Sequence, residues 1–142
     1  MSKAAELAKA GETLTNQPSG RKNIVTNGAM QIAQRATSAT GLGAANGYFT
    51  LDRFKMNISA TSAGRLTMTQ TADGPSGFAN CVKLDCTTAD TSIAATEGLI
   101  FLTTIEGQDL QQLKKGTSDA EKLTVSFYVK GNAKTYMCEL QN

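Results

Sequence analysis

The sequence predicts a mostly β protein, an antiparallel β-sandwich preceded by a short N-terminal α-helix. Runs of alternating apolar and polar residues recur along the chain and are separated by Gly, Asn and Pro turns, which is the pattern of half-buried strands. Nineteen residues are Thr, while only 18% are charged, and Thr is well suited to the exposed face of a strand. The length of 142 residues suits one domain of ordinary size.

Residues 2–10 predict the helix, with Ser2 as its N-cap and Gly11 at its end. The apolar positions form one thin stripe, made of Ala4, Leu7, Ala8 and Leu14. Because so short a helix is unstable alone in water, it is either a frayed terminus or an arm that docks on a partner. Pro18, Ser19 and Gly20 then mark a linker. We therefore divide the chain into an arm and linker, residues 1–22, and a β domain, residues 23–142.

The β domain is expected to contain a series of short strands. They are residues 24–25, 48–58, 64–70, 81–86, 98–105, 123–130 and 136–140. The inward-facing residues of the early strands are expected to be Phe54, Met56, Ile58, Leu66 and Met68. The almost continuously apolar run 98–105 predicts a central strand covered on both faces. Residues 108–115 predict a short helix, and residues 35–47 a loop.

The composition argues against most catalytic chemistry. The chain has no His, so a Ser-His-Asp or Cys-His arrangement is impossible within it. Its carboxylates are scattered, the notable ones being Asp52, Asp85, Glu97, Glu106 and Asp109. The three cysteines are best interpreted as buried free thiols. We expect no catalytic residue, no cofactor and no metal, with calcium near Asp73 or Asp90 as an open alternative.

Two classes of partner are also disfavoured. The net charge is only +2 and the basic residues are interspersed, which argues against a nucleic acid. No apolar run approaches the length of a membrane span, and the N-terminus lacks the pattern of a signal peptide. We expect no membrane insertion.

A few positions are candidates for binding. Asp52 and Arg53 interrupt an apolar run, and a structural ion pair is favoured there over a ligand contact. Tyr48 and Tyr128 are candidates for stacking on a sugar, although core packing is the more common use of an aromatic residue in a strand.

Several segments together resemble a recurrent domain of tail-fibre and other virion proteins of tailed phages, especially marine and cyanobacterial ones. The opening block of that family resembles residues 23–38, N-I-V-T-N-G-A-M-Q-I-A-Q-R-A-T-S, and its next block resembles residues 48–54, Y-F-T-L-D-R-F. Further blocks are residues 75–78, 84–90, 105–110 and 123–130. The usual Trp near Phe54 is absent here.

The resemblance implies a jelly-roll domain similar to carbohydrate-binding modules. It implies a structural virion protein, a tail fibre or its virion-proximal part, made in the host cytoplasm and commonly a homotrimer. Its partners would be other phage tail or virion proteins, reached through residues 1–22, and a host surface glycan during adsorption. A carbohydrate-binding module that recognises surface glycans is the alternative, and a polysaccharide depolymerase is less favoured.

Family domains usually continue through several further strands, so the β domain is expected to be incomplete at its C-terminus. We expect the strands left without a neighbour to lie at an assembly interface, through Ile24, Val25, Tyr136 and Leu140. The resemblance does not identify any residue of this sequence as a sugar contact.

Overall fold

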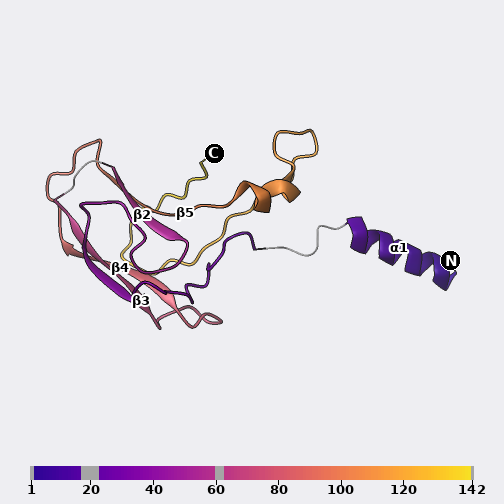
Figure 1. Cartoon of the computed structure of the whole chain (residues 1–142), viewed down its shortest axis with the longest axis horizontal. Helices are drawn as coiled ribbons and strands as arrows, with labels where there is room; N and C mark the ends of the chain where they lie inside the picture. Colours follow the sequence, from indigo (N-terminus) through magenta and orange to yellow (C-terminus); the bar gives the residue numbers. More distant parts are fainter. Residues whose placement is uncertain (1, 17–22, 60–62, 142) are drawn as a thin grey trace.

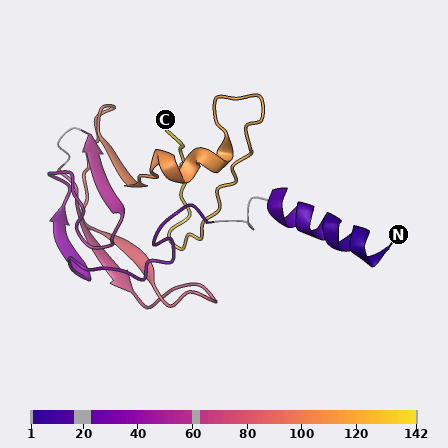
Figure 2. The ribbon, with the colours of Figure 1, turned by 45° about the vertical axis from the view of Figure 1, so that its right-hand side comes forward.

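The computed structural model describes residues 2–16, 23–59 and 63–141, and the side chains of residues 10–16 lie outside this description. The described chain is mostly β, with antiparallel strands in two sheets. Its elements are α1 (Lys3–Asn16), β1 (Ser38–Leu42), β2 (Phe54–Ser59), β3 (Arg65–Thr71), β4 (Cys81–Thr88), β5 (Gly98–Thr103) and the 3-10 helix η1 (Gly107–Leu113). Figures 1 and 2 both draw α1 apart from the two sheets.

The first sheet has the order β1-β3-β4, so β3 is its central strand. The register of β3 with β4 places Met68 opposite Leu84, and the register with β1 places Met68 opposite Ala39. Between Ala39 and Leu42 the β1 register shifts, where Gly41 adopts a φ of 68°. A bulge at this position bends the strand and turns Leu42 toward the core.

In the described part of the chain the second sheet is formed by β2 and β5, paired in an unbroken register from Phe54 opposite Thr103 to Ser59 opposite Gly98. The rings of Phe54 and Phe101 stack across it with centroids 5.0 Å apart. A two-stranded sheet is marginally stable by itself, so it depends on the apolar residues that it shares with the first sheet.

One small core joins the two sheets. Leu42 of β1, Met68 of β3 and Met56 of β2 are buried together. Phe54 and Leu51 are buried as well, which confirms the inward orientation expected for Phe54, Met56 and Met68. The arrangement is two antiparallel sheets that share a core without closing around it.

The expected strand at Ile24 and Val25 is absent, so this prediction is wrong. The side-chain oxygen Oδ1 of Asn23 accepts a hydrogen bond from the main-chain N–H of Val25 at 3.0 Å. The segment turns immediately afterwards, with Asn27 at a φ of 59°. Local side-chain bonds of this kind compete with strand pairing. The predicted turn at Asn27-Gly28 is confirmed.

The expected strands at residues 123–130 and 136–140 are also absent. Their alternating pattern permits a strand, but a strand forms only where another edge supplies hydrogen bonds. In the described part of the chain no strand pairs with either segment. Both instead run as irregular backbone, with the intervening turn held by the Tyr136 hydroxyl, which donates to the carbonyl of Asn132 at 3.0 Å.

Other boundaries differ from expectation. Gly11 does not end α1, which continues to Asn16, since Gly inside a helix costs only about 1 kcal/mol. The loop expected at residues 35–47 contains β1. The expected strand 48–58 begins only at Phe54, and the expected helix at 108–115 is the 3-10 helix η1. The run 98–105 is not covered on both faces, because β5 has β2 as its single strand neighbour and exposes Leu99 and Ile100.

Candidate functional site

An open pocket of about 630 Å³ lies beside the start of β2 and the end of β5. It is lined by Gln34, Arg35, Tyr48, Asp52, Arg53, Thr104 and Glu106. These residues come from three segments that are well separated in the sequence. Six of the seven carry a planar polar or aromatic group, and the seventh is a threonine. Such side chains recognise polar ligands by directed hydrogen bonds and stacking.

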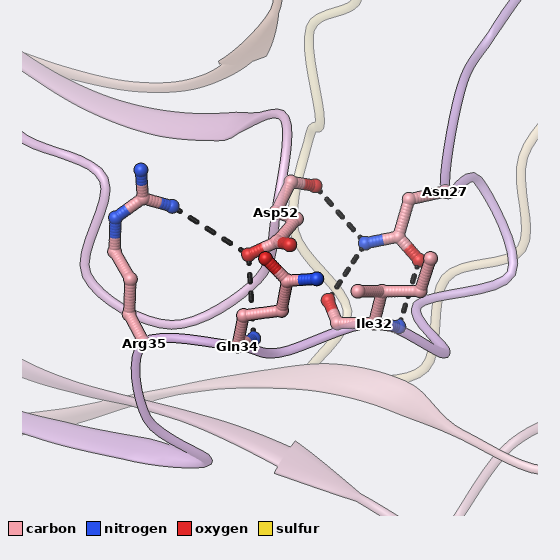
Figure 3. Close-up of polar contacts among 5 residues, drawn as sticks. All are labelled: Asn27, Ile32, Gln34, Arg35 and Asp52. Carbon is pink, nitrogen blue, oxygen red and sulfur yellow. Dashed lines mark hydrogen bonds and ion pairs between the residues drawn. The ribbon is translucent and has the colours of Figure 1, made fainter.

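Asn27 connects the first segment to the second, as Figure 3 shows. Its amide Nδ2 donates to the main-chain carbonyl of Ile32 at 2.9 Å and to that of Asp52 at 3.0 Å. Its Oδ1 accepts from the N–H of Ile32 at 3.0 Å. The main-chain N–H of Asp52 in turn donates to the Ile32 carbonyl at 3.0 Å. The two segments are therefore joined by a main-chain hydrogen bond as well as by the hydrogen bonds of the Asn27 side chain.

The carboxylate of Asp52 reaches the same segment. Its Oδ1 accepts a hydrogen bond from the main-chain N–H of Gln34 at 3.3 Å and lies 3.5 Å from Nη1 of Arg35. The Asp52 side chain is 20% exposed, whereas that of Arg35 is 54% exposed. Asp52 thus holds the main chain of Gln34 and the side chain of Arg35, as Figure 3 shows. Gln34 and Arg35 both line the pocket.

Arg53 connects the second segment to the third. Its Nη2 lies 3.1 Å from Oε1 of Glu106, and the other oxygen of Glu106 accepts from Nε2 of Gln108 at 2.9 Å. Asp52 therefore pairs with Arg35 and Arg53 with Glu106, on two different segments that line the pocket. Asp52 and Arg53 are thus in structural ion pairs, as predicted. Their partners are Arg35 and Glu106, which are not adjacent to them in the sequence.

Tyr48 supplies the aromatic surface of the pocket. The guanidinium carbon of Arg35 lies 5.4 Å from its ring centroid, a cation–π distance. The Tyr48 side chain remains 44% exposed. Its ring is thus held in place by Arg35 while retaining area for contact with a ligand.

The backbone around the pocket is unusual. The described residues with a positive φ that are not glycine are Asn27, Met30, Arg53 and Lys114. The first three lie in or next to the segments that form the pocket. This conformation costs on the order of 1 kcal/mol or more for residues such as Met and Arg, and it persists only where surrounding contacts enforce it. One such contact comes from β3, where Nε2 of Gln70 donates to the carbonyl of Met30 at 2.6 Å.

The two tyrosines proposed as sugar contacts have different surroundings. Tyr48 lines the pocket. Tyr128 is not among the lining residues; it packs against Phe78 with ring centroids 5.7 Å apart and is 77% exposed. The sequence reasoning missed the contribution of Gln34, Arg35, Thr104 and Glu106. The signal that pointed to the pocket was the charged pair inside an apolar run.

The expected docking arm and assembly interface are only partly described. Ala4, Leu7 and Ala8 are exposed on α1, while the side chain of Leu14 lies outside the described residues. The linker expected at residues 13–22 is wrong over residues 13–16, which belong to α1, and residues 17–22 lie outside the described residues. Ile24 and Val25 are half-buried, and Tyr136 and Leu140 are 52% and 64% exposed. In the described part of the chain no strand pairing joins these two pairs of residues.

The remaining candidates for chemistry do not converge. Of the five notable carboxylates, Asp52 and Glu106 share the pocket and each faces a guanidinium. Asp85 pairs with Lys83 on β4, and Glu97 accepts from the N–H of Ala94. Among residues 2–16, 23–59 and 63–141 there is no group of three or more potential metal ligands.

The cysteines differ from expectation in their burial. All three are free thiols, but Cys81 is half-buried and Cys86 and Cys138 are exposed. Cys81 and Cys86 are not fully buried because β4 is an edge strand, and Cys138 is exposed because its segment pairs with no strand among the described residues.

Comparison with known proteins gave no match to a family model, to a curated protein or to a solved structure. No helix in the described part of the chain combines the length and the apolar character needed to cross a membrane.

Proposed function

We propose that the chain is a structural protein of a phage tail fibre, in which the β domain completes its core against other copies of itself in a homotrimer. The proposal rests on the resemblance of its sequence blocks to those of tail-fibre proteins and on the surface that the fold leaves uncovered. Residues 1–22 would attach the fibre to other virion proteins.

The observation that carries the proposal is the exposed apolar surface of the C-terminal segment. Seven large hydrophobic side chains between residues 125 and 140 are exposed, namely Val125, Phe127, Tyr128, Val129, Tyr136, Met137 and Leu140. Isolated exposed hydrophobic residues are ordinary, but seven within residues 125–140 are more typical of a segment that contacts a partner. The alternation of Val125, Phe127 and Val129 with polar or amphipathic neighbours is suited to addition as a strand to a sheet edge.

The assembly state of the purified chain tests the proposal. Sedimentation velocity should show a trimer, and hydrogen exchange should show protection of amides in residues 123–130. Phe127→Asp places a charge on the apolar face and should shift the protein toward monomer. Ser126→Asp places the same charge at the neighbouring polar position, is the matched control and should leave the trimer intact. A monomer with unprotected amides in this segment would contradict the proposal.

Attachment to the particle is tested in virions of the phage that encodes the chain. Deleting residues 2–14 should leave the β domain folded but remove the protein from purified particles, as measured by mass spectrometry. Stoichiometric retention of the deletion variant would show that the arm does not dock the fibre.

A second candidate function is a carbohydrate-binding module, and the exposed ring of Tyr48 beside Arg35 in the open pocket favours it. Binding of the chain to a glycan array, lost in Tyr48→Ala and retained in Tyr128→Ala, would support it. Equal loss in both variants, or no binding by the parent chain, would count against it.

A further inference from the structure

The pocket has more hydrogen-bond donors than its own acceptors use. A guanidinium carries five N–H donors. In the described part of the chain, Arg35 directs Nη1 to Asp52 at 3.5 Å, and Arg53 directs Nη2 to Glu106 at 3.1 Å. Both side chains are about half exposed, at 54% and 47%. The remaining N–H groups of the two arginines are therefore available at the pocket.

The acceptors of the pocket are more fully engaged. Oδ1 of Asp52 accepts from the Gln34 N–H and faces Arg35, whereas its Oδ2 has no partner in the described part of the chain. Both oxygens of Glu106 have partners, Oε1 facing Arg53 and Oε2 accepting from Gln108. Two cations and two anions line the pocket. Most of its charged hydrogen-bonding groups that have no partner among the described residues are nevertheless N–H donors of the two arginines. A ligand that supplies an oxyanion complements it best, since guanidinium binds carboxylate by paired, charge-assisted hydrogen bonds.

The aromatic component indicates what else the ligand contains. Tyr48 presents an exposed ring beside Arg35, and Gln34 and Thr104 add neutral polar groups. A flat apolar ring surface flanked by such groups fits a molecule with one apolar face and many hydroxyls, which is the chemistry of a pyranose. The pocket volume of about 630 Å³ is in the usual range for a small-molecule site.

We propose that this pocket binds an acidic saccharide, a pyranose that carries a carboxylate. Its carboxylate accepts hydrogen bonds from the free N–H groups of Arg35 and Arg53, and the C–H face of its ring packs on Tyr48. This proposal rests on the carbohydrate-binding candidate and specifies the class of sugar and the residues that recognise it. The ion pairs with Asp52 and Glu106 hold the two guanidinium groups in position before the ligand arrives.

Calorimetric titration of the full 142-residue chain tests the class of sugar. The probes are trisaccharides of galacturonate, glucuronate and mannuronate, each compared with its carboxyl-reduced neutral counterpart. We expect at least one uronate trisaccharide to bind at least about tenfold more tightly than its neutral counterpart, because a hydrogen bond to a charged group contributes more than a neutral one. The preference should diminish as salt is raised, since half-exposed charges are screened.

Three substitutions test the residues. Arg35→Gln and Arg53→Gln should each weaken uronate binding about tenfold or more and bring the uronate affinity toward that of the neutral counterpart. Lys83→Gln is the matched control, since it also removes one cation from an exposed ion pair, that with Asp85 on β4, outside the pocket. It should leave binding unchanged. Circular dichroism checks that each variant is folded. Tyr48→Ala leaves both cations in place and tests the packing of the sugar ring on Tyr48.

The outcomes separate the two levels of the proposal. Equal affinity for uronate and neutral trisaccharides, or an equal effect of Lys83→Gln, would overturn the acidic class and leave a carbohydrate-binding module standing. Absence of binding by every saccharide would overturn both.

Discussion

The side-chain amide of Asn27 donates to the main-chain carbonyl of Asp52 at 3.0 Å, across 25 positions of sequence. With the two bonds that Asn27 makes to Ile32, this contact joins a turn near the start of the β domain to the turn that precedes β2. Arg35 and Asp52 line the pocket on the segments so joined. We therefore expect the three side-chain hydrogen bonds of Asn27 to stabilise the fold and to maintain the shape of the pocket.

Replacing Asn27 should destabilise the fold measurably. Asn27→Gly removes three side-chain hydrogen bonds while tolerating the φ of 59°, and should lower the free energy of unfolding by about 2–3 kcal/mol. Asn27→Ala adds the strain of a side chain at positive φ and should cost about 1 kcal/mol more. Urea unfolding followed by circular dichroism measures both. Asn132→Ala, at an exposed turn, is the control and should change stability by less than about 0.5 kcal/mol.

The small core makes buried methionines critical. Met56 is fully buried in the cluster that joins the two sheets, so Met56→Ala should cost about 2–5 kcal/mol, enough to unfold a marginally stable domain at moderate temperature. Ile93→Ala truncates a side chain that is 72% exposed and lies outside the surface proposed for assembly, and it should change stability by about 0.5 kcal/mol or less. Thermal unfolding compares the two. Similar melting temperatures for both variants would show that Met56 does not stabilise the fold.

Local patterns predicted the parts of the fold that depend on local residues. The positions of β3 and β4 and the second half of the expected strand 48–58 follow from alternation and turn residues, and the position of β5 follows from a short, almost continuously apolar run. The buried positions of Phe54, Met56 and Met68 were predicted for the same reason. β1 was missed because its residues, S-A-T-G-L, are small and its register shifts between Ala39 and Leu42.

What the sequence could not predict depends on contacts between distant segments. The run at residues 123–130 has the period of a strand, yet strand formation depends on a partner edge that the pattern cannot identify. The pocket likewise arises because Arg35, Arg53 and Glu106 are brought together from separate segments. The adjacency of Asp52 and Arg53 indicated a charged site, but not that each residue would face a different partner.

The hydroxyl of Thr50 offers a different test. Thr50 is fully buried, and its Oγ1 has no hydrogen-bond partner in the described part of the chain. Thr50→Val keeps the shape and removes the cost of burying an unpaired hydroxyl, so it should raise the free energy of unfolding by about 1 kcal/mol. Thr40→Val, on an exposed position of β1, is the matched control and should have little effect. A loss of stability in Thr50→Val would reveal that the hydroxyl is hydrogen-bonded in solution.

The C-terminal segment should respond to high pH through Lys130. Its Nζ donates to Oδ2 of Asp73 at 2.7 Å, and this hydrogen bond, followed by the charge of Asp73, raises the pKa of Lys130 above its ordinary value of 10.5. The contribution of the pair to holding the segment is therefore fully present below pH 10.5 and is lost as the pH rises through the raised pKa. An NMR titration of the Lys130 side chain should show that Asp73→Asn lowers this pKa toward 10.5, while Asp119→Asn, at an exposed turn, leaves it unchanged. An identical titration in the parent chain and in Asp73→Asn would show that the ion pair does not form in solution.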